Sequence, residues 1–227
     1  MGELILCSHP IAAMPYYIDN ISLNVYSLEE LCYYIENHMY LIEADFMSEE
    51  LCLWIGQELD EKDLAQSLRS VLLGNGNLSD FTELILRSCG YCSEDTIRHI
   101  RSVLLDMQNK SVFECSKIRA DRYMESEKYV KAIHEYRKLL GMEEECKKNP
   151  VLEGNIRHNL GTACAELFLF DEAAANFLNA YRLNQNRESL AACMAACRLA
   201  KKTDILKKYK EEFHVSDEAF KSMSDQW

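Results

Sequence analysis

Two cysteines, Cys89 and Cys92, have a spacing at which paired thiols can perform chemistry. A Cys-x-x-Cys pair at the start of a helix can cycle through a disulfide when its surroundings stabilise one thiolate. Enzymes that use the pair place it after a buried strand, whereas here an amphipathic helical stretch, residues 81–88, precedes it. Gly90 is typical of a helix end and Ser93 of a helix N-cap. The sequence therefore favours a turn between two helices, with a thiol-disulfide oxidoreductase that uses Cys89 and Cys92 as the alternative.

A metal site would need further ligands beside this cysteine pair. Cys7 and His9 could join Cys89 and Cys92 at a zinc ion, but no second close-spaced pair of ligands marks a zinc ribbon or finger. The sequence also lacks the His-Glu-x-x-His, Gly-x-Ser-x-Gly and Gly-x-x-x-x-Gly-Lys patterns of metalloproteases, serine hydrolases and phosphate-binding loops. We therefore expect no metal, no cofactor and no enzymatic activity.

The cysteine content indicates a reducing compartment rather than a disulfide scaffold. Ten cysteines occur among 227 residues, but residues 1–7 have neither the basic segment nor the apolar length of a signal peptide. No apolar run reaches the roughly 18 residues that span a bilayer. We expect a cytoplasmic protein without membrane partners, in which most thiols act as small buried hydrophobic groups.

Charge divides the chain into two parts. Residues 1–107 contain 18 acidic and 5 basic side chains, a net charge of -13, whereas the rest contains 19 acidic and 20 basic side chains, a net charge of +1; the sum is -12. The acidic part would repel phosphate backbones, so no nucleic acid partner is expected and a basic protein partner is favoured. A simpler explanation is that the acidity maintains solubility. We expect an acidic helical domain, residues 1–109, followed by a second domain, residues 110–227.

Helical periodicity dominates the acidic domain after residue 26. Ser27 and Ser48 are candidate N-caps, because glutamates follow in the first turn and an apolar stripe begins there. Apolar positions at helical spacing predict five helices, within residues 27–39, 48–59, 64–72, 81–88 and 97–107. Before them, the apolar runs at residues 4–7 and 23–26 are compatible with two short strands joined by a helical turn.

The second domain contains an internal repeat. When the chain is shifted by 41 residues, small residues fall on small residues and most aromatic residues fall on aromatic ones. The matched pairs are Ala120 with Gly161, Tyr123 with Cys164, Tyr129 with Phe170, Ala132 with Ala173 and Tyr136 with Phe177. Small side chains allow helix axes to approach within about 8 to 10 Å. The repeat therefore predicts stacked helical hairpins.

The second copy resembles the tetratricopeptide repeat, a helix-turn-helix unit of about 34 residues. The positions that carry the resemblance are Leu160, Gly161, Ala173, Phe177 and Ala180. The copy departs from the repeat pattern at three landmarks, with Arg157 in place of Trp, Cys164 in place of Tyr and Gln185 in place of Pro. The resemblance implies a short right-handed superhelix of antiparallel helical hairpins in the C-terminal half of the chain.

The neighbouring copies are less regular. The longer period of the first copy implies an insertion of 41 minus about 34 residues, which we place between Leu140 and Pro150 as a lengthening of the second helix. A third copy is expected to have Ala195 at the small position of its first helix, and Ile205 at the corresponding position of its second. Residues 216–219 are expected to begin a short capping helix.

In tetratricopeptide proteins, the first helices of successive units line a groove that binds a peptide or a helix. The resemblance gives the following candidate partner-binding residues: Lys117, Asp121, Asn155, Asn159, Thr162 and Glu166. One subclass clamps a C-terminal carboxylate, but only Lys117 and Asn159 match its five positions here. Asp121, Ser189 and Cys193 replace the others, and a carboxylate at position 121 would repel such a ligand. For each single residue, a solvated polar position is the simpler explanation.

The sequence as a whole predicts an all-α protein in which helical hairpins follow an acidic helical domain. The expected function is that of a non-enzymatic scaffold or adaptor that binds a protein or peptide partner in the groove. Alternatively, the acidic domain binds the partner and the hairpins serve as a spacer. A regulatory homo-oligomer, in which the small apolar residues 191–197 pack against another chain, is a further alternative to the oxidoreductase.

Overall fold

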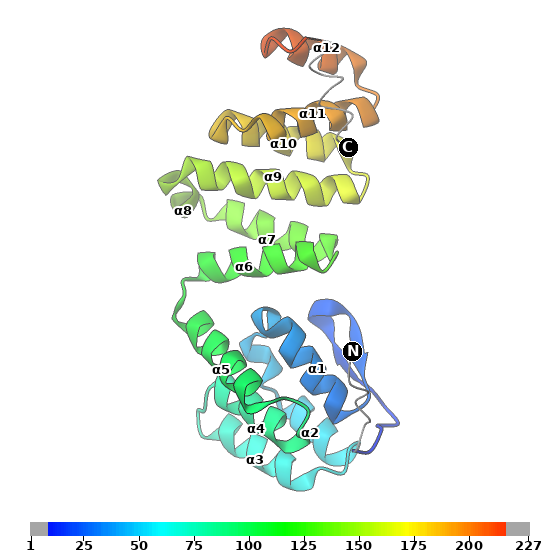
Figure 1. The fold of residues 1–227 in the computed structure, drawn as a ribbon, viewed down its shortest axis with the longest axis vertical. Coiled ribbons are helices and arrows are strands. Elements are labelled where there is room, and N and C mark those ends of the chain that lie inside the picture. Colours follow the sequence, from blue (N-terminus) through cyan, green and yellow to red (C-terminus); the bar gives the residue numbers. More distant parts are fainter. Residues whose placement is uncertain (1–8, 217–227) are drawn as a thin grey trace. The chain divides into compact units, whose positions relative to one another are not determined.

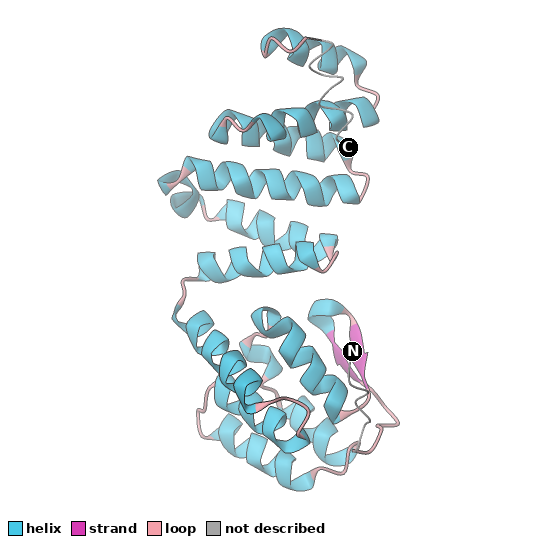
Figure 2. Cartoon of the chain, viewed as in Figure 1, coloured by secondary structure: helices cyan, strands magenta, loops and turns pink. Residues whose placement is uncertain are grey.

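The computed structural model describes residues 9–216 and confirms the all-α fold (Figures 1 and 2). Backbone contacts divide the chain into two compact units, Met1–Lys110 and Ser111–Trp227, called unit 1 and unit 2 below. Among residues 9–216, a single two-stranded sheet accompanies the helices. Residues 4–7 and most of the expected capping helix, from position 217 onward, lie outside the described residues.

From residue 9 onward, unit 1 contains an antiparallel hairpin followed by five α-helices. Its elements are β1 (Tyr16–Ile18), η1 (Asp19–Ile21), β2 (Leu23–Val25), α1 (Leu28–His38), η2 (Met39–Leu41), η3 (Ala44–Phe46), α2 (Glu49–Gln57), α3 (Lys62–Leu73), α4 (Leu78–Cys89) and α5 (Glu94–Asn109), where η denotes a 3-10 helix. The five α-helices are those that the sequence predicts. The strand prediction is right for β2, but β1, whose Tyr16 pairs with Val25, was not predicted as a strand; a helical turn joins the two.

Side-chain caps set where several helices of unit 1 begin. The side-chain oxygens of Ser27, Ser48, Asn77 and Ser93 each accept a hydrogen bond from a backbone N–H in the first turn, at 2.9 to 3.2 Å. Acidic residues follow each cap, where the helix dipole favours negative charge. The apolar faces behind these caps meet in a core whose fully buried members include Leu28, Leu31, Ile35, Leu51, Ile55, Leu68, Phe81, Ile85 and Ile100.

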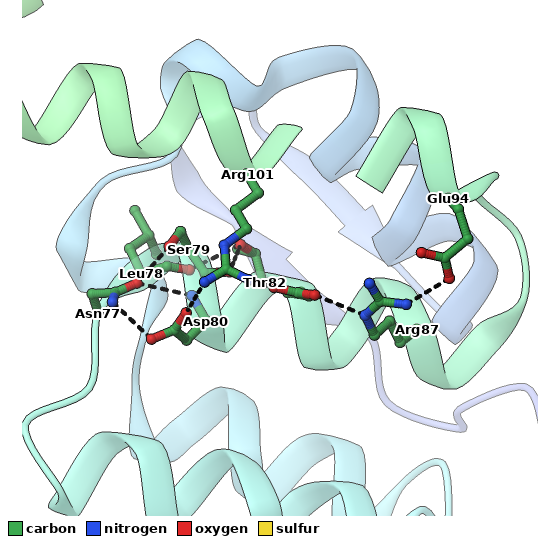
Figure 3. Close-up of polar contacts among 9 residues, drawn as sticks. Asn77, Leu78, Ser79, Asp80, Thr82, Arg87, Glu94 and Arg101 are labelled. Carbon is green, nitrogen blue, oxygen red and sulfur yellow. Dashed lines mark hydrogen bonds and ion pairs between the residues drawn. The ribbon is translucent and has the colours of Figure 1, made fainter. Parts of the chain in front are cut away.

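A chain of ion pairs fixes α5 against α4 (Figure 3). Glu83 on α4 pairs with Arg87 at 2.8 Å and with Arg101 of α5. Arg101 also reaches Asp80 at 3.1 Å, and Arg87 reaches Glu94 at the start of α5 at 2.5 Å. Each exposed ion pair alone contributes little to stability, but a network that shares two arginines restrains the turn between the helices. That turn contains the Cys-x-x-Cys motif.

Unit 2 is a stack of helical hairpins. Its elements are α6 (Val112–Glu125), α7 (Tyr129–Gly141), α8 (Glu143–Lys148), α9 (Pro150–Glu166), α10 (Phe170–Asn184), α11 (Arg187–Leu199) and α12 (Thr203–Glu212). Helix α7 packs against both α6 and α9, and α10 packs against both α9 and α11. The second helix of a hairpin therefore joins its own first helix to the first helix of the next hairpin (Figure 1).

The three hairpins share one turn geometry. Glu127, Phe168 and Lys201 each adopt a left-handed backbone conformation, with φ of 56°, 61° and 58°. In each turn the next residue donates its N–H to a carbonyl in the last turn of the first helix, in the pairs Lys128 to Tyr123, Leu169 to Cys164 and Lys202 to Cys197, at 2.8 to 2.9 Å. The repeat is thus present in the backbone as well as in the sequence.

Small residues lie at the contact between α9 and α10, as the repeat predicts. Gly161, Ala173 and Ala180 are buried, and a Cβ added at Gly161 would lie 2.8 Å from the ring of Phe177. A Cβ added at Gly154 would lie 2.9 Å from Cβ of Asn184. Larger residues at these two positions of α9 would push α10 away.

Two details of the repeat prediction are wrong. The insertion lies where expected, but it forms the separate helix α8, because the backbone of Met142 leaves the helical conformation after α7. The third turn follows the second by 33 residues, from 168 to 201. When the copies are aligned with this spacing, the position equivalent to Gly161 is Met194 rather than Ala195. The position equivalent to Ala173 is Leu206 rather than Ile205. Accordingly Leu206 is buried, whereas Ile205 is 39% exposed.

The segment 191–197 does not form a free apolar surface. Five of its seven residues are buried within unit 2: Ala192, Cys193, Met194, Ala196 and Cys197. They belong to α11, which packs against α10 and α12. The packing of this segment against another chain therefore finds no support in the structure.

Candidate functional site

The six groove candidates lie on the first helices of two successive hairpins. Lys117 and Asp121 are one turn apart on α6, and Asn155, Asn159, Thr162 and Glu166 follow one another at spacings of three or four residues on α9. Residues at such spacings share one side of a helix. We call these six residues the first-helix face. Asn155 and Glu166 are exposed, and the other four are partly buried.

Three members of the first-helix face meet around a tyrosine that the repeat pattern assigns to the core. The hydroxyl of Tyr136 on α7 donates to Oδ1 of Asp121 at 2.7 Å. The amide of Asn159 donates to the same Oδ1 at 3.4 Å and to the Tyr136 hydroxyl at 3.3 Å. Lys117 forms an ion pair with Oδ2 of Asp121. Residues of α6, α7 and α9 are thus linked, and the link joins the first hairpin to the second.

The other three candidates make contacts elsewhere. Oδ1 of Asn155 accepts from the amide of Asn184 on α10 at 3.1 Å. The hydroxyl of Thr162 donates to the carbonyl of His158 at 3.2 Å. Glu166, at the C-terminal end of α9, is exposed. The structure therefore brings together Lys117, Asp121 and Asn159, while Asn155, Thr162 and Glu166 continue along the same helix.

A second polar link, which the sequence did not predict, joins α9 to α11. Nδ1 of His158 lies 2.9 Å from Oγ of the buried Ser189. Burial lowers the pKa of His158, an effect that Glu188 partly opposes, so the neutral ring is favoured. Both Tyr136 and His158 carry a sequence signal, because a buried tyrosine or histidine needs a hydrogen-bonding partner for its polar end.

A different cluster forms around the Cys-x-x-Cys motif in unit 1. Cys89 is the last residue of α4, Gly90 ends that helix with φ of 67°, and Ser93 caps α5, so the predicted interhelical turn is confirmed. Glu29 and Cys32, three residues apart on α1, both lie beside the end of α4: Glu29 is close to Cys89, and the thiol of Cys32 donates to the carbonyl of Ile85 at 3.7 Å. His9, from the segment before β1, donates its backbone N–H to Oε1 of Glu29 at 3.2 Å, and its Nδ1 lies 2.8 Å from the same oxygen.

These four residues, called the thiol cluster below, combine a carboxylate, an imidazole and two thiols. Donor atoms of His9, Glu29 and Cys89 all lie within 4.8 Å of one another. Interaction with Cys32 lowers the pKa of the Cys89 thiol, and the same interaction together with burial raises the pKa of Cys32. The hydrogen bond to Glu29 raises the pKa of His9.

Cys92 has a different environment from Cys89. Burial raises the pKa of Cys92 to about 12, which disfavours the thiolate that disulfide exchange requires. The thiol that lies beside the last turn of α4 is Cys32, from α1, which donates to the carbonyl of Ile85 at 3.7 Å. Of the zinc ligands considered from the sequence, His9 and Cys89 have donor atoms within 4.8 Å of each other. Cys7 lies outside the described residues. Glu29 and Cys32 were missed because helical periodicity assigns them only to the capped start and the apolar face of α1.

Comparisons with known proteins identified no matching family model, curated protein or solved structure. None of the helices in the described part of the chain has both the length and the apolar character that crossing a bilayer requires.

Proposed function

We propose that unit 2 is a tetratricopeptide-like interaction module that binds a peptide or a helix of a partner protein along the first-helix face. The observation that carries the proposal is the link between Asp121, Tyr136 and Asn159. It holds a carboxylate and an amide in fixed positions on adjacent first helices. Pre-positioned polar groups lose little conformational entropy on binding, which makes such a surface suited to recognition.

The charges of the face favour a ligand with a cationic or hydrogen-bond-donating side chain. Lys117 is already paired with Asp121, and Glu166 adds an exposed carboxylate. The six residues together carry one positive and two negative charges. Ser189, at a position that the carboxylate-binding subclass fills with a basic residue, is buried and bonded to His158. A ligand that ends in a free carboxylate is therefore disfavoured.

The state of the cysteines supports a cytoplasmic adaptor. All nine cysteines in the described part of the chain are free thiols, and six of them are buried. Thiols persist in reducing compartments, where glutathione and thioredoxin oppose disulfide formation. The proposed adaptor has no enzymatic activity. Its function is to bring the partner bound by unit 2 close to a second partner bound by unit 1.

A peptide library displayed on phage and selected against the full-length protein would test the proposal, because such a selection does not require the partner to be identified first. Selected peptides would be synthesised and their affinities measured by calorimetry. Asn159→Ala is expected to weaken binding about tenfold or more, because a lost hydrogen bond to a charged group costs about 1.5 to 3 kcal/mol. Lys117→Ala should strengthen the binding of a cationic ligand, because it removes a positive charge and frees the carboxylate of Asp121. Matched controls on second helices, Asn176→Ala and Lys138→Ala, should leave the affinity unchanged.

Circular dichroism would establish that each variant remains folded before its affinity is interpreted. Peptides that bind wild type and both first-helix variants equally would refute the proposal. Selection of peptides that end in a free carboxylate, with affinity dependent on Lys117, would contradict the predicted ligand chemistry and restore the clamp interpretation.

A further inference from the structure

The thiol cluster of unit 1 has the composition of a metal site. His9, Glu29 and Cys89 supply one nitrogen, one carboxylate and one sulfur donor, and Cys32, beside the last turn of α4, supplies a second sulfur. Zinc binds all three donor types, and thiolate sulfur selects it over the harder magnesium and calcium ions. The cluster lies entirely within unit 1, so it is independent of the function proposed for unit 2.

The distances in the cluster are close to those that zinc requires. Metal-ligand bonds of about 2.0 to 2.3 Å place the donors of a tetrahedral site about 3.5 Å apart. Donor atoms of His9, Glu29 and Cys89 already lie within 4.8 Å of one another. The thiol of Cys32 lies beside the last turn of α4, where it donates to the carbonyl of Ile85 at 3.7 Å, one turn before Cys89. Small side-chain movements can therefore bring the first three donors onto one ion, and Cys32 joins them when its thiol leaves the carbonyl of Ile85.

Burial makes the cluster a favourable place for a cation. Cys32 is fully buried and Glu29 is 5% exposed. A buried carboxylate is stable when it is paired or coordinates a metal, and a thiolate nearby adds a second negative charge. The side chain of His9 is 19% exposed and Cys89 is partly buried, so an ion can enter from their side.

The backbone holds the donors in place before any ion binds. Glu29 and Cys32 lie on α1, which packs against α4, the helix that ends at Cys89. The left-handed Gly90 and the ion pairs of Glu83 and Arg87 fix the end of α4 (Figure 3). The contact of Nδ1 with Glu29 orients the imidazole of His9, and the bond from its backbone N–H holds this residue beside α1. Ligands on two packed helices need little reorganisation to bind an ion.

We infer that unit 1 binds one zinc ion through the thiolates of Cys32 and Cys89, a ring nitrogen of His9 and the carboxylate of Glu29. The Cys-x-x-Cys motif contributes Cys89 alone, and the second sulfur comes from α1. This set differs from the Cys-x-x-Cys pair that a zinc ribbon would use. The bound ion ties the segment before β1 to α1 and α4, and thereby stabilises unit 1.

Cobalt(II) substitution would test the site in the full-length protein. The protein would be fully reduced, stripped with a chelator and titrated with Co²⁺. We expect one ion per chain, with the thiolate-to-cobalt charge-transfer band and the intense visible bands of tetrahedral cobalt, and bleaching of both by added Zn²⁺. Hydrogen exchange should show slower exchange in α1 and in the end of α4 after zinc is added.

Variants separate this ligand set from its alternatives. Cys89→Ser and His9→Gln should abolish or strongly weaken binding, and Glu29→Gln should weaken it at least about tenfold, the loss typical even for an outer-sphere carboxylate. Cys32→Ala should halve the thiolate charge-transfer intensity or abolish binding. The controls are Cys52→Ala, which alters another buried cysteine of unit 1, and Cys92→Ser; both should bind as wild type does.

Three results would overturn the inference. The first is the absence of stoichiometric cobalt binding by the reduced, folded chain. The second is loss of binding in Cys92→Ser with full binding retained in Cys32→Ala, since that would place the site on the Cys-x-x-Cys pair. The third is binding that none of the four substitutions changes. Cys89 is partly exposed and His9 lies outside the helices, so their variants test the site even if Cys32→Ala does not fold.

Discussion

Replacing Gly161 with alanine tests whether close approach of α9 and α10 holds unit 2 together. An added Cβ would lie 2.8 Å from both Cδ1 and Cε1 of Phe177. The Phe177 side chain is 2% exposed, so its ring has little space into which to move. Gly141 provides a matched control, because it also lies on a helix, α7, and no atom lies within 4 Å of its added Cβ.

Both substitutions gain the higher helix propensity of alanine, but only Gly161→Ala also overpacks a buried contact. Alanine is favoured over glycine by about 1 kcal/mol in a helix interior, and by less at a helix end such as Gly141. Overpacking a buried site costs about 1 to 3 kcal/mol. Gly161→Ala should therefore lower the free energy of unfolding by up to about 2 kcal/mol, whereas Gly141→Ala should leave it unchanged or raise it slightly. The difference between the variants isolates the packing cost.

Urea denaturation followed by circular dichroism would measure both stabilities, and hydrogen exchange would locate the loss in α9 and α10. Gly154→Ala provides a second test, because its Cβ would meet Cβ of Asn184 at 2.9 Å and the carbonyl of Ala180 at 3.1 Å, atoms that cannot rotate away. If Gly161→Ala and Gly154→Ala are as stable as Gly141→Ala, tight helix packing does not explain the small residues of this repeat.

Three further predictions concern unit 2. Tyr136→Phe removes the hydroxyl bonded to Asp121 and should lower the free energy of unfolding by about 1.5 to 3 kcal/mol; an unchanged urea midpoint would show that the link between hairpins carries no stability. His158 has a lowered pKa in the folded chain, so its contribution to stability is complete above the ordinary pKa of 6.5 and decreases as the pH falls below it. Thermal unfolding measured between about pH 5 and pH 8 should show this loss of stability at low pH. The loss should be smaller in His158→Gln, and in wild type Glu188 limits it because its charge opposes the lowering of the His158 pKa. Glu127→Gly relieves a left-handed backbone conformation and should raise the unfolding free energy by about 0.5 to 1 kcal/mol in urea titrations; a loss of stability would argue against strain in the turn.

Local signals in the sequence were sufficient for most helices. Ser27, Ser48 and Ser93 act as caps in the structure because an N-cap needs only its own side chain and the N–H groups of the next turn. Apolar spacing likewise predicts which side of each helix is buried. These features involve residues close together in the chain, so the sequence alone carries them.

The thiol cluster could not be read from the sequence in this way. His9 and Cys89 are 80 positions apart, from 9 to 89, and Glu29 reaches them only because α1 packs against α4. Glu29 is buried, and a buried glutamate suggests a functional role. In the sequence, however, its position in the first turn of α1 is already explained by the helix dipole. Contacts that depend on tertiary packing need the fold.

The register of the third hairpin shows why the repeat is hard to follow by residue type. The shared turn requires a left-handed residue and a donor N–H, and Glu127, Phe168 and Lys201 all satisfy it. None of these residues is glycine, so the turn leaves no recognisable residue in the sequence. The alignment of the third copy therefore had to rest on the pattern of small and large packing residues. A helix with many small residues, such as α11, fits that pattern in several alignments. Phe168 keeps its left-handed conformation although it is 79% exposed, and its ring lies 5.9 Å from that of Phe170. The hydrogen bonds of the turn, rather than the preferences of its residues, therefore preserve this geometry through the stack.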